Sequence, residues 1–94
     1  MEEKVYVGDT GTAINLDCGQ DISAASARSI QVRKPDGTIT SWPAQASGNR
    51  ALRFTTEVGS LDMPGIWRLQ ALVTLPTGEW LGRTAELWVY RRFS

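Results

Sequence analysis

The sequence predicts an all-β fold, a sandwich of about seven short antiparallel strands in a single domain that spans residues 1–94. Turn-forming segments rich in glycine and proline recur about every ten residues, and short runs of β-branched and aromatic residues lie between them. Several short strands at this spacing are typical of a sandwich or barrel. The turn segments are Gly8–Gly11, Pro35–Gly37, Ser47–Asn49, Met63–Gly65 and Pro76–Gly78.

The first half of the chain predicts two short strands followed by a hairpin. Ile30 and Val32 alternate with polar residues, as the residues of a half-buried strand do. The next run follows directly after the turn Pro35–Gly37, which favours a hairpin between the two strands. The strands expected here are Val5–Val7, Ala13–Leu16, Arg28–Lys34 and Thr38–Trp42.

Helix is the alternative for the segment Asp21–Arg28, where alanine and serine cluster. Ile22 is its single large apolar residue, so the segment lacks an apolar face at helical spacing. We expect a loop there, with at most one helical turn.

The second half contains the clearest alternation of the chain. Trp67 and Leu69 begin an apolar series that continues at every second residue to Val73. This pattern predicts a strand with Trp67 in the core, and Leu52 and Phe54 share one face of a shorter strand before it. The last strand is expected to carry Ala85, Leu87 and Val89 on one side and Glu86, Trp88 and Tyr90 on the other.

The charge balance excludes several classes of partner. Ten lysines and arginines balance ten aspartates and glutamates, and Arg91 and Arg92 are too short a run to neutralise a nucleic-acid backbone. No apolar run is long enough to cross a membrane. The polar start Met1–Lys4 leads directly into a strand, without the pattern of a secretory signal. We therefore expect no nucleic-acid partner, no membrane partner and a protein of the cytoplasm.

Side chains suited to catalysis are scarce. The chain has no histidine and one cysteine, Cys18, which excludes an internal disulfide and the usual serine and cysteine triads. Without a histidine or a cation beside it, Cys18 is expected to be a small, partly buried side chain. The aspartates sit in turns, where they commonly bond to nearby backbone.

We therefore expect no enzymatic activity, no cofactor and no metal site. Two alternatives stay open at this point. One is a cation held by Asp9, Asp17 and Asp21, and the other is a cryptic site built from paired carboxylates.

Four tryptophans are many for a chain of this length. Trp88 and Tyr90 share a face with Glu86 and point away from the expected core, and outward aromatic neighbours are typical of interface centres. We therefore take Trp88, Tyr90 and Glu86 as the candidate interface. The alternatives are that arginine stems cover the rings, or that a β-bulge shifts the alternation by one residue. Trp42 and Trp80 are candidates to stack across the two hairpins.

One corner favours the immunoglobulin-like version of the sandwich. Asp62, Gly65 and Trp67 are spaced like the acid, the glycine and the buried aromatic at the turn into the penultimate strand of such domains. Tryptophan stands where tyrosine is more usual, so a hydroxyl bond to the backbone is missing. We expect packing and Asp62 to hold this corner instead.

A resemblance to a known family rests on five segments of turn and core residues, Tyr6–Thr12, Asp21–Ser23, Val32–Gly37, Thr55–Thr56 and Leu61–Gln70. Together they resemble small immunoglobulin-like phage and prophage structural domains, such as the N-terminal domain of the phage baseplate upper protein. The resemblance implies a non-catalytic virion part, a tail, baseplate or fibre-attachment component, that docks other virion subunits or associates with itself. It also implies a location in the virion, and in the host cytoplasm during assembly.

A carbohydrate-binding module is the alternative function. Exposed tryptophans would then serve as stacking platforms for sugar rings. Such a module needs a planar row of aromatic side chains with polar neighbours, which the arrangement of the strands decides.

Overall fold

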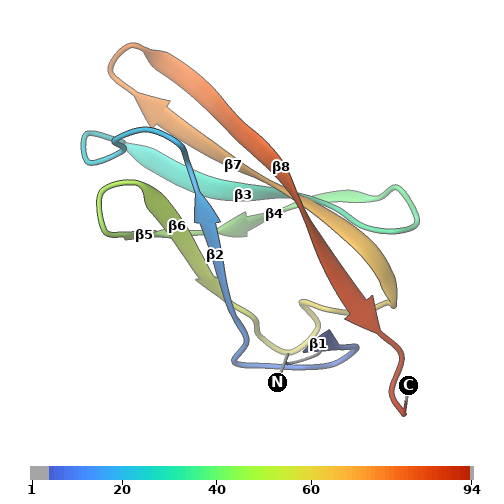
Figure 1. The fold of residues 1–94 in the computed structure, drawn as a ribbon. Coiled ribbons are helices and arrows are strands. Elements are labelled where there is room, and N and C mark those ends of the chain that lie inside the picture. Colours follow the sequence, from blue (N-terminus) through green and yellow to red (C-terminus); the bar gives the residue numbers. More distant parts are fainter. Residues whose placement is uncertain (1–4, 94) are drawn as a thin grey trace.

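Eight strands form two sheets that pack face to face in the described part of the chain, residues 5–93 of the computed structural model (Figure 1). One sheet has five strands in the order β1-β8-β7-β3-β4, and the other has three in the order β2-β6-β5. Neighbouring strands are antiparallel except β1 and β8, which run parallel. The strands are β1 (Val5–Tyr6), β2 (Ala13–Asp17), β3 (Ala27–Arg33), β4 (Ile39–Pro43), β5 (Gln45–Ser47), β6 (Ala51–Thr55), β7 (Gly65–Leu75) and β8 (Gly78–Tyr90).

The connections make the sandwich a Greek key. The hairpins β3–β4, β5–β6 and β7–β8 each stay within one sheet, whereas the links β1–β2, β2–β3, β4–β5 and β6–β7 cross to the other. Immunoglobulin-like sandwiches are built from such hairpins and crossings, and the predicted fold class is confirmed. The chain has one more strand than the alternation indicates, because β5 follows β4 after a single residue, Ala44.

The core consists of inward side chains from both sheets. The ring of Trp42 stacks on that of Phe54 at 4.7 Å and lies 6.0 Å from that of Trp67. Because Phe54 belongs to the three-stranded sheet, these aromatic contacts join the two sheets. Trp42 therefore does not stack on Trp80, and that expectation is wrong. The buried apolar residues are Ile14, Leu16, Ile22, Ala25, Ile30, Val32, Trp42, Leu52, Phe54, Leu61, Trp67, Leu69, Ala71, Val73 and Val89.

The corner before β7 is held by a hydrogen bond that the sequence does not predict. Trp67 is completely buried, and its indole Nε1–H donates to the carbonyl oxygen of Met63 at 3.0 Å. The indole thus takes the part that a tyrosine hydroxyl plays in related corners. Asp62 contributes from outside, because its carboxylate pairs with Lys34 Nζ at 2.8 Å. The same Nζ lies 5.6 Å from the centroid of the Trp67 ring.

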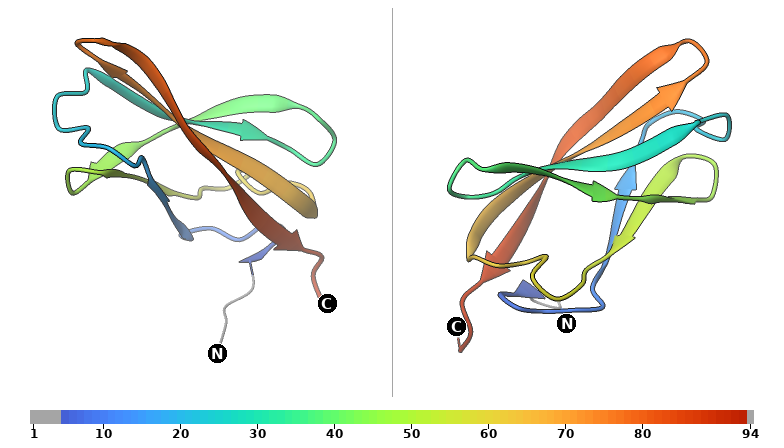
Figure 2. Two further views of the ribbon diagram at one scale, coloured as in Figure 1. Left: turned by 45° about the horizontal axis from the view of Figure 1, so that its top comes forward. Right: turned by 180° about the vertical axis from the view of Figure 1, so that it is seen from behind.

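The hairpin of β7 and β8 contains the two longest strands, and its tip stands apart from the β5–β6 turn (Figure 2). Its register slips between Gln70 and Leu72, where Gly82 and Arg83 of β8 both lie opposite Ala71. This β-bulge changes which face of the sheet the residues of β8 occupy on either side of it. Beyond the bulge, β1 covers the free edge of β8 only at Val89 and Tyr90 within the described residues.

Candidate functional site

The outer face of the five-stranded sheet, away from the core, carries side chains of β7 and β8 in matched rows. The register places an aromatic beside an aliphatic residue, an acid beside an arginine, and a hydroxyl beside an amide. The rows are Trp88 with Ile66, Glu86 with Arg68, Thr84 with Gln70, and Leu81 with Leu72. We call these eight residues the outer face.

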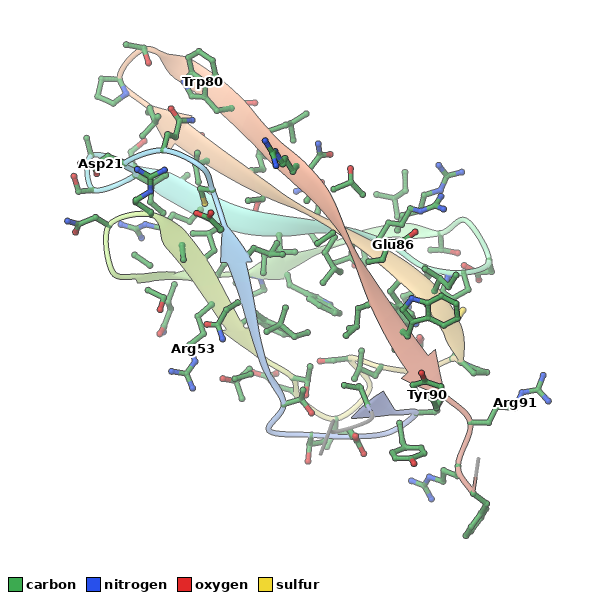
Figure 3. The ribbon with its side chains drawn as sticks, in the orientation of Figure 1. Asp21, Arg53, Trp80, Glu86, Tyr90 and Arg91 are labelled. Carbon is green, nitrogen blue, oxygen red and sulfur yellow. The ribbon has the colours of Figure 1, made fainter. Side chains whose placement is uncertain are left out.

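All three predicted interface residues lie on this side of β8. Trp88 is 55% exposed, which agrees with its predicted direction away from the core. Tyr90 is partly buried, and its ring lies 6.2 Å from that of Tyr6. Glu86 pairs with Arg68 at 3.6 Å, and both side chains are about half exposed. In Figure 3, Glu86 and Tyr90 lie along one half of β8, and Trp80 lies near the tip of the hairpin.

The exposed tryptophans do not form a row. Trp80 lies opposite Val73, whose side chain is buried in the core, whereas Trp88 lies opposite Ile66 on the outer face. The bulge between them causes this difference, because two residues an even number apart would otherwise share a face. Trp80 is 44% exposed, and its Nε1–H donates to Thr77 Oγ1 at 3.3 Å. The planar platform of a carbohydrate-binding module is therefore absent from the described residues.

Sequence reasoning missed two exposed aliphatic residues on the same side of the sheet. Leu81 is 61% exposed and Ile39 is 69% exposed. They lie at the edges of a shallow hollow of about 390 Å³ that Gln31 and Gln70 also line. The alternation around Leu81 would have identified it only if the position of the bulge had been known.

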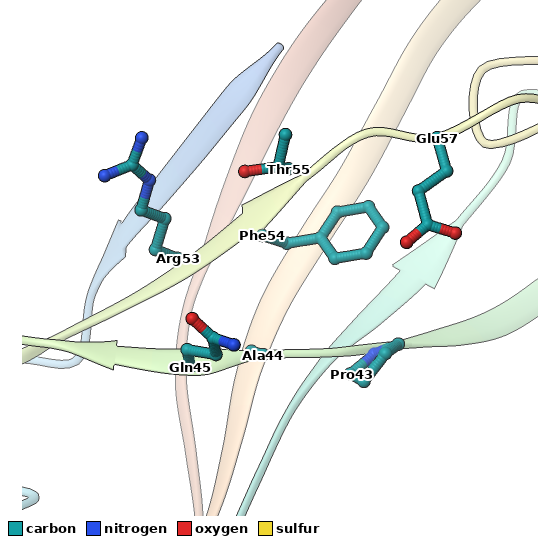
Figure 4. A pocket seen from close by; sticks show the side chains of 7 residues that line it. All are labelled: Pro43, Ala44, Gln45, Arg53, Phe54, Thr55 and Glu57. Atoms are coloured by element: carbon teal, nitrogen blue, oxygen red, sulfur yellow. The ribbon is translucent and has the colours of Figure 1, made fainter. Parts of the chain in front are cut away.

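The outer side of the three-stranded sheet is different in character. Within the described chain, β2, β5 and β6 contribute no exposed large apolar residue. A hollow of about 380 Å³ opens at the edge of the sandwich, where the chain passes from β4 to β5 (Figure 4). Arg53 and Glu57 line it without pairing with each other, and Phe54 forms its apolar wall. This hollow has mixed polarity and brings no group of titratable side chains together.

A third hollow, of about 690 Å³, lies between the end of β2 and the middle of β8. Asp17 and Cys18 line one side of it, and Gly82 and Arg83 line the other. Burial and, to a smaller extent, the nearby Asp17 carboxylate raise the pKa of the Cys18 thiol. The thiolate that would react or bind a metal is therefore disfavoured, and the half-buried cysteine matches its predicted character.

The carboxylates of the turn aspartates accept hydrogen bonds from backbone N–H groups of nearby residues, as their positions predict. The carboxylate of Asp17 accepts from the Gly19 N–H, and that of Asp9 accepts from the Tyr6 N–H. Asp21 and Asp36 accept in the same way from residues two positions on, at 2.8 Å and 2.9 Å. The bonds to Ser23 and Thr38 lower the pKa of the Asp21 and Asp36 carboxyls.

These bonds leave no carboxylate cluster. Among residues 5–93, no three His, Cys, Asp or Glu side chains lie close enough together to hold a metal ion. Asp9, Asp17 and Asp21 therefore do not form the cation site considered above. The same part of the chain contains no helix long and apolar enough to cross a membrane.

Comparison with known proteins yields one structural likeness. No family model matches the chain, and no curated protein matches it. The crystal structure of CopC from Methylosinus trichosporium OB3b matches 99% of the chain and 89% of its own, with 17% identity and a TM-score of 0.63. The two chains share a fold.

This likeness corrects the resemblance drawn from the sequence. The assignment to phage structural domains, and with it the tail, baseplate or fibre-attachment role, is contradicted because the structural neighbour is CopC. The location in a virion or in the host cytoplasm is contradicted by the same likeness. The five segments behind the resemblance contain turn and core residues, and such residues specify a sandwich without specifying its family.

Proposed function

We propose that this protein is a non-catalytic module that binds another protein through the outer face of its five-stranded sheet. The exposed ring of Trp88 carries this proposal. It lies beside Ile66 and two positions from Tyr90, so a partner would cover a continuous apolar patch. Aromatic residues are enriched at the centres of protein interfaces, and burying apolar surface gains about 25 cal/mol per Å².

The charges around this patch support the same function. Protein interfaces combine apolar contacts with hydrogen bonds and charge pairs. Glu86 and Arg68 lie in the row next to the apolar patch, and both keep half of their side-chain surface available to a partner. In the next row, Thr84 offers its hydroxyl and Gln70 its amide oxygen, because Gln70 Nε2–H donates to the Gly82 carbonyl at 2.8 Å.

We propose no catalytic activity because the chain has few side chains suited to catalysis. It has no histidine, and the carboxylates of Asp17, Asp21 and Asp36 bond to backbone in turns. General acid–base and nucleophilic mechanisms need such groups placed within reach of each other.

A copper site is left out for a related reason. Imidazole, thiolate and thioether groups are the usual protein ligands of copper, and this chain offers one cysteine thiol, two methionine thioethers and no imidazole. The residues present therefore do not fit a copper site, and the shared sandwich does not supply one.

Site-specific photo-crosslinking tests the proposal. Trp88 is replaced by p-benzoylphenylalanine in the full chain, which is expressed in its source cells and irradiated. We expect a covalent adduct with a protein from position 88. The matched control is position 53, where Arg53 is exposed on the opposite sheet. No adduct from position 88, or an equal yield from position 53, overturns the proposal.

A further inference from the structure

We propose that the partner of the outer face is a second copy of this chain, packed about a two-fold axis that runs along β7 and β8. This inference rests on the proposed function, because it names the partner of the same surface. An interface between two identical copies must be complementary to itself. The matched rows of β7 and β8 have this property.

The symmetry can be followed row by row. An axis between β7 and β8, parallel to both, places β8 of each copy over β7 of the other. Each side chain then meets the residue that it already neighbours in its own sheet. Trp88 covers Ile66 of the second copy, and Leu81 covers Leu72 of the second copy. Apolar side chains therefore meet apolar side chains at both ends of the interface.

The charges obey the same symmetry. Glu86 of each copy faces Arg68 of the second copy, so two new pairs of opposite charge form across the axis. Within one copy the two side chains are 3.6 Å apart and half exposed, which leaves both able to bond to a partner as well. The row between the charges and Leu81 brings Thr84 against Gln70 of the second copy. Gln70 Nε2–H donates to the Gly82 carbonyl of its own chain at 2.8 Å, and its Oε1 can accept from the Thr84 hydroxyl across the axis.

The opposite side of the sandwich does not offer this match. The outward residues of β2 and β6 include Asn15, Asp17 and Arg53, and no large apolar side chain is exposed on these two strands. Stacking two sheets about 10 Å apart gains free energy mainly from apolar side chains between them. The five-stranded sheet is therefore the side on which two copies can stack.

The size of the contact predicts a weak dimer. The rows from Leu81 to Trp88 span about 20 Å at about 3.3 Å per residue. Covering a patch of this length leaves the buried area below the roughly 800 Å² per partner of a standard interface. We expect a dissociation constant on the order of 100 µM.

Charge reversal separates this pairing from other modes of association. R68E puts two acids on the outer face, and E86R puts two arginines there, so each variant repels its own copy. Each loses one exposed ion pair, worth about 1 kcal/mol or less, so both should fold, as circular dichroism checks. Mixing the two variants sets acids against arginines across the axis and restores both intermolecular pairs.

Sedimentation equilibrium of the full chain supplies the measurement. Between about 10 µM and about 1 mM, we expect the wild type to dimerise and each variant alone to bind itself at least tenfold more weakly. The equimolar mixture should regain the wild-type affinity. A wild type that stays monomeric throughout this range, or a mixture that is no tighter than the separate variants, overturns the second copy as partner.

The crosslinking result keeps the two proposals apart. An adduct of twice the chain's mass from position 88 supports both. An adduct with a different protein, together with a monomeric wild type, overturns the second copy and leaves the proposed function standing. The absence of an adduct from position 88 overturns the proposed function itself.

Discussion

Trp67 shows how one side chain fixes the junction between the two sheets. Its ring fills the core beside Trp42, and its Nε1–H reaches the carbonyl of Met63 in the turn that leads into β7. The buried indole therefore supplies both the apolar volume and the polar bond that the corner needs. The ammonium group of Lys34 lies over the ring and forms a salt bridge with the Asp62 carboxylate. This pair links the outside of the corner to the β3–β4 hairpin.

Replacing this side chain with Trp67→Phe separates the bond from most of the packing. Phenylalanine keeps an aromatic ring but leaves the Met63 carbonyl without its donor and opens a small cavity. We expect a loss of about 2–4 kcal/mol in the free energy of unfolding, measured by urea denaturation at low protein concentration. Trp88→Phe is the matched control on the surface and should change the free energy by about 0.5 kcal/mol or less. Equal losses in both variants would contradict the role of the indole bond.

The hydrogen bond to Asp36 predicts how the stability of the protein depends on pH. The backbone N–H of Thr38 donates to its carboxylate and lowers the pKa of Asp36. A carboxyl whose pKa is lower in the folded chain adds stability above its unfolded pKa of about 3.9, and this stability is lost as the pH falls through the folded pKa. We expect Asp36→Asn to lower the melting temperature at pH 7, and the difference from wild type to shrink toward pH 2–3.

A proton titration followed by NMR checks the cause directly. The carboxyl carbon of Asp36 should titrate with a midpoint below about 3.9, the value of an unperturbed aspartate. A midpoint at or above that value would show that the bond to Thr38 does not favour the charged form.

At the scale of elements, the turn before β7 depends on a glycine and a proline that face each other. Gly65 has φ +131°, and a Cβ added to it would lie 2.7 Å from Pro35 Cγ. The backbone conformation and the close approach of the β3–β4 turn both require glycine at this position.

Gly65→Ala should therefore destabilise the sandwich by about 2–4 kcal/mol, the sum of a backbone penalty and an overpacking penalty. The control is Gly11→Ala, which also has positive φ but nothing within 4 Å of the added Cβ. It should cost about 1 kcal/mol, because only the backbone is strained. Thermal unfolding of the two variants compares them, and equal losses would mean that Pro35 does not resist the new methyl group.

The sequence predicts these elements where the alternation is regular. Strands β7 and β3 are predicted because side chains alternate between the two faces of a strand. The inward series from Trp67 to Val73 identifies β7, and the inward pair Ile30 and Val32 identifies β3. The short β5 escapes prediction because all three of its residues are exposed and none marks an inward face. β5 forms because it pairs with β6, and this pairing cannot be recognised from the residues of β5 alone.

The candidate site was predictable in part for the same reason. The alternation of β8 places Trp88 and Tyr90 on the outer side, and the structure agrees for the portion beyond the bulge. The contribution of Leu81 could not be predicted, because Gly82 and Arg83 both face Ala71 and the alternation slips there. The rows that match β8 with β7 also depend on the register, which a turn sequence alone does not reveal for so long a hairpin.

At the scale of the whole molecule, the fold and its chemistry are separate properties. The chain shares a sandwich with CopC across almost its full length, yet only one residue in six is the same. Sandwiches tolerate such divergence because their cores need apolar side chains at alternate positions and little else. Metal binding needs particular donor atoms in a fixed geometry, and divergence at a few positions removes it.

Copper therefore should not stabilise this protein. A ligand at one hundred times its dissociation constant adds about 2.7 kcal/mol, which raises the melting temperature of a domain of this size by about 10 °C or more. We expect Cu²⁺ in small excess, with a chelator-treated sample as reference, to shift the melting temperature by about 1 °C or less. Cys18→Ser is measured in parallel, because the thiol is the softest donor of the chain and the one most prone to react with copper. A rise of several degrees in both proteins would contradict this prediction and indicate a copper site built from oxygen, thioether or backbone donors. A rise confined to the wild type would place the copper on Cys18.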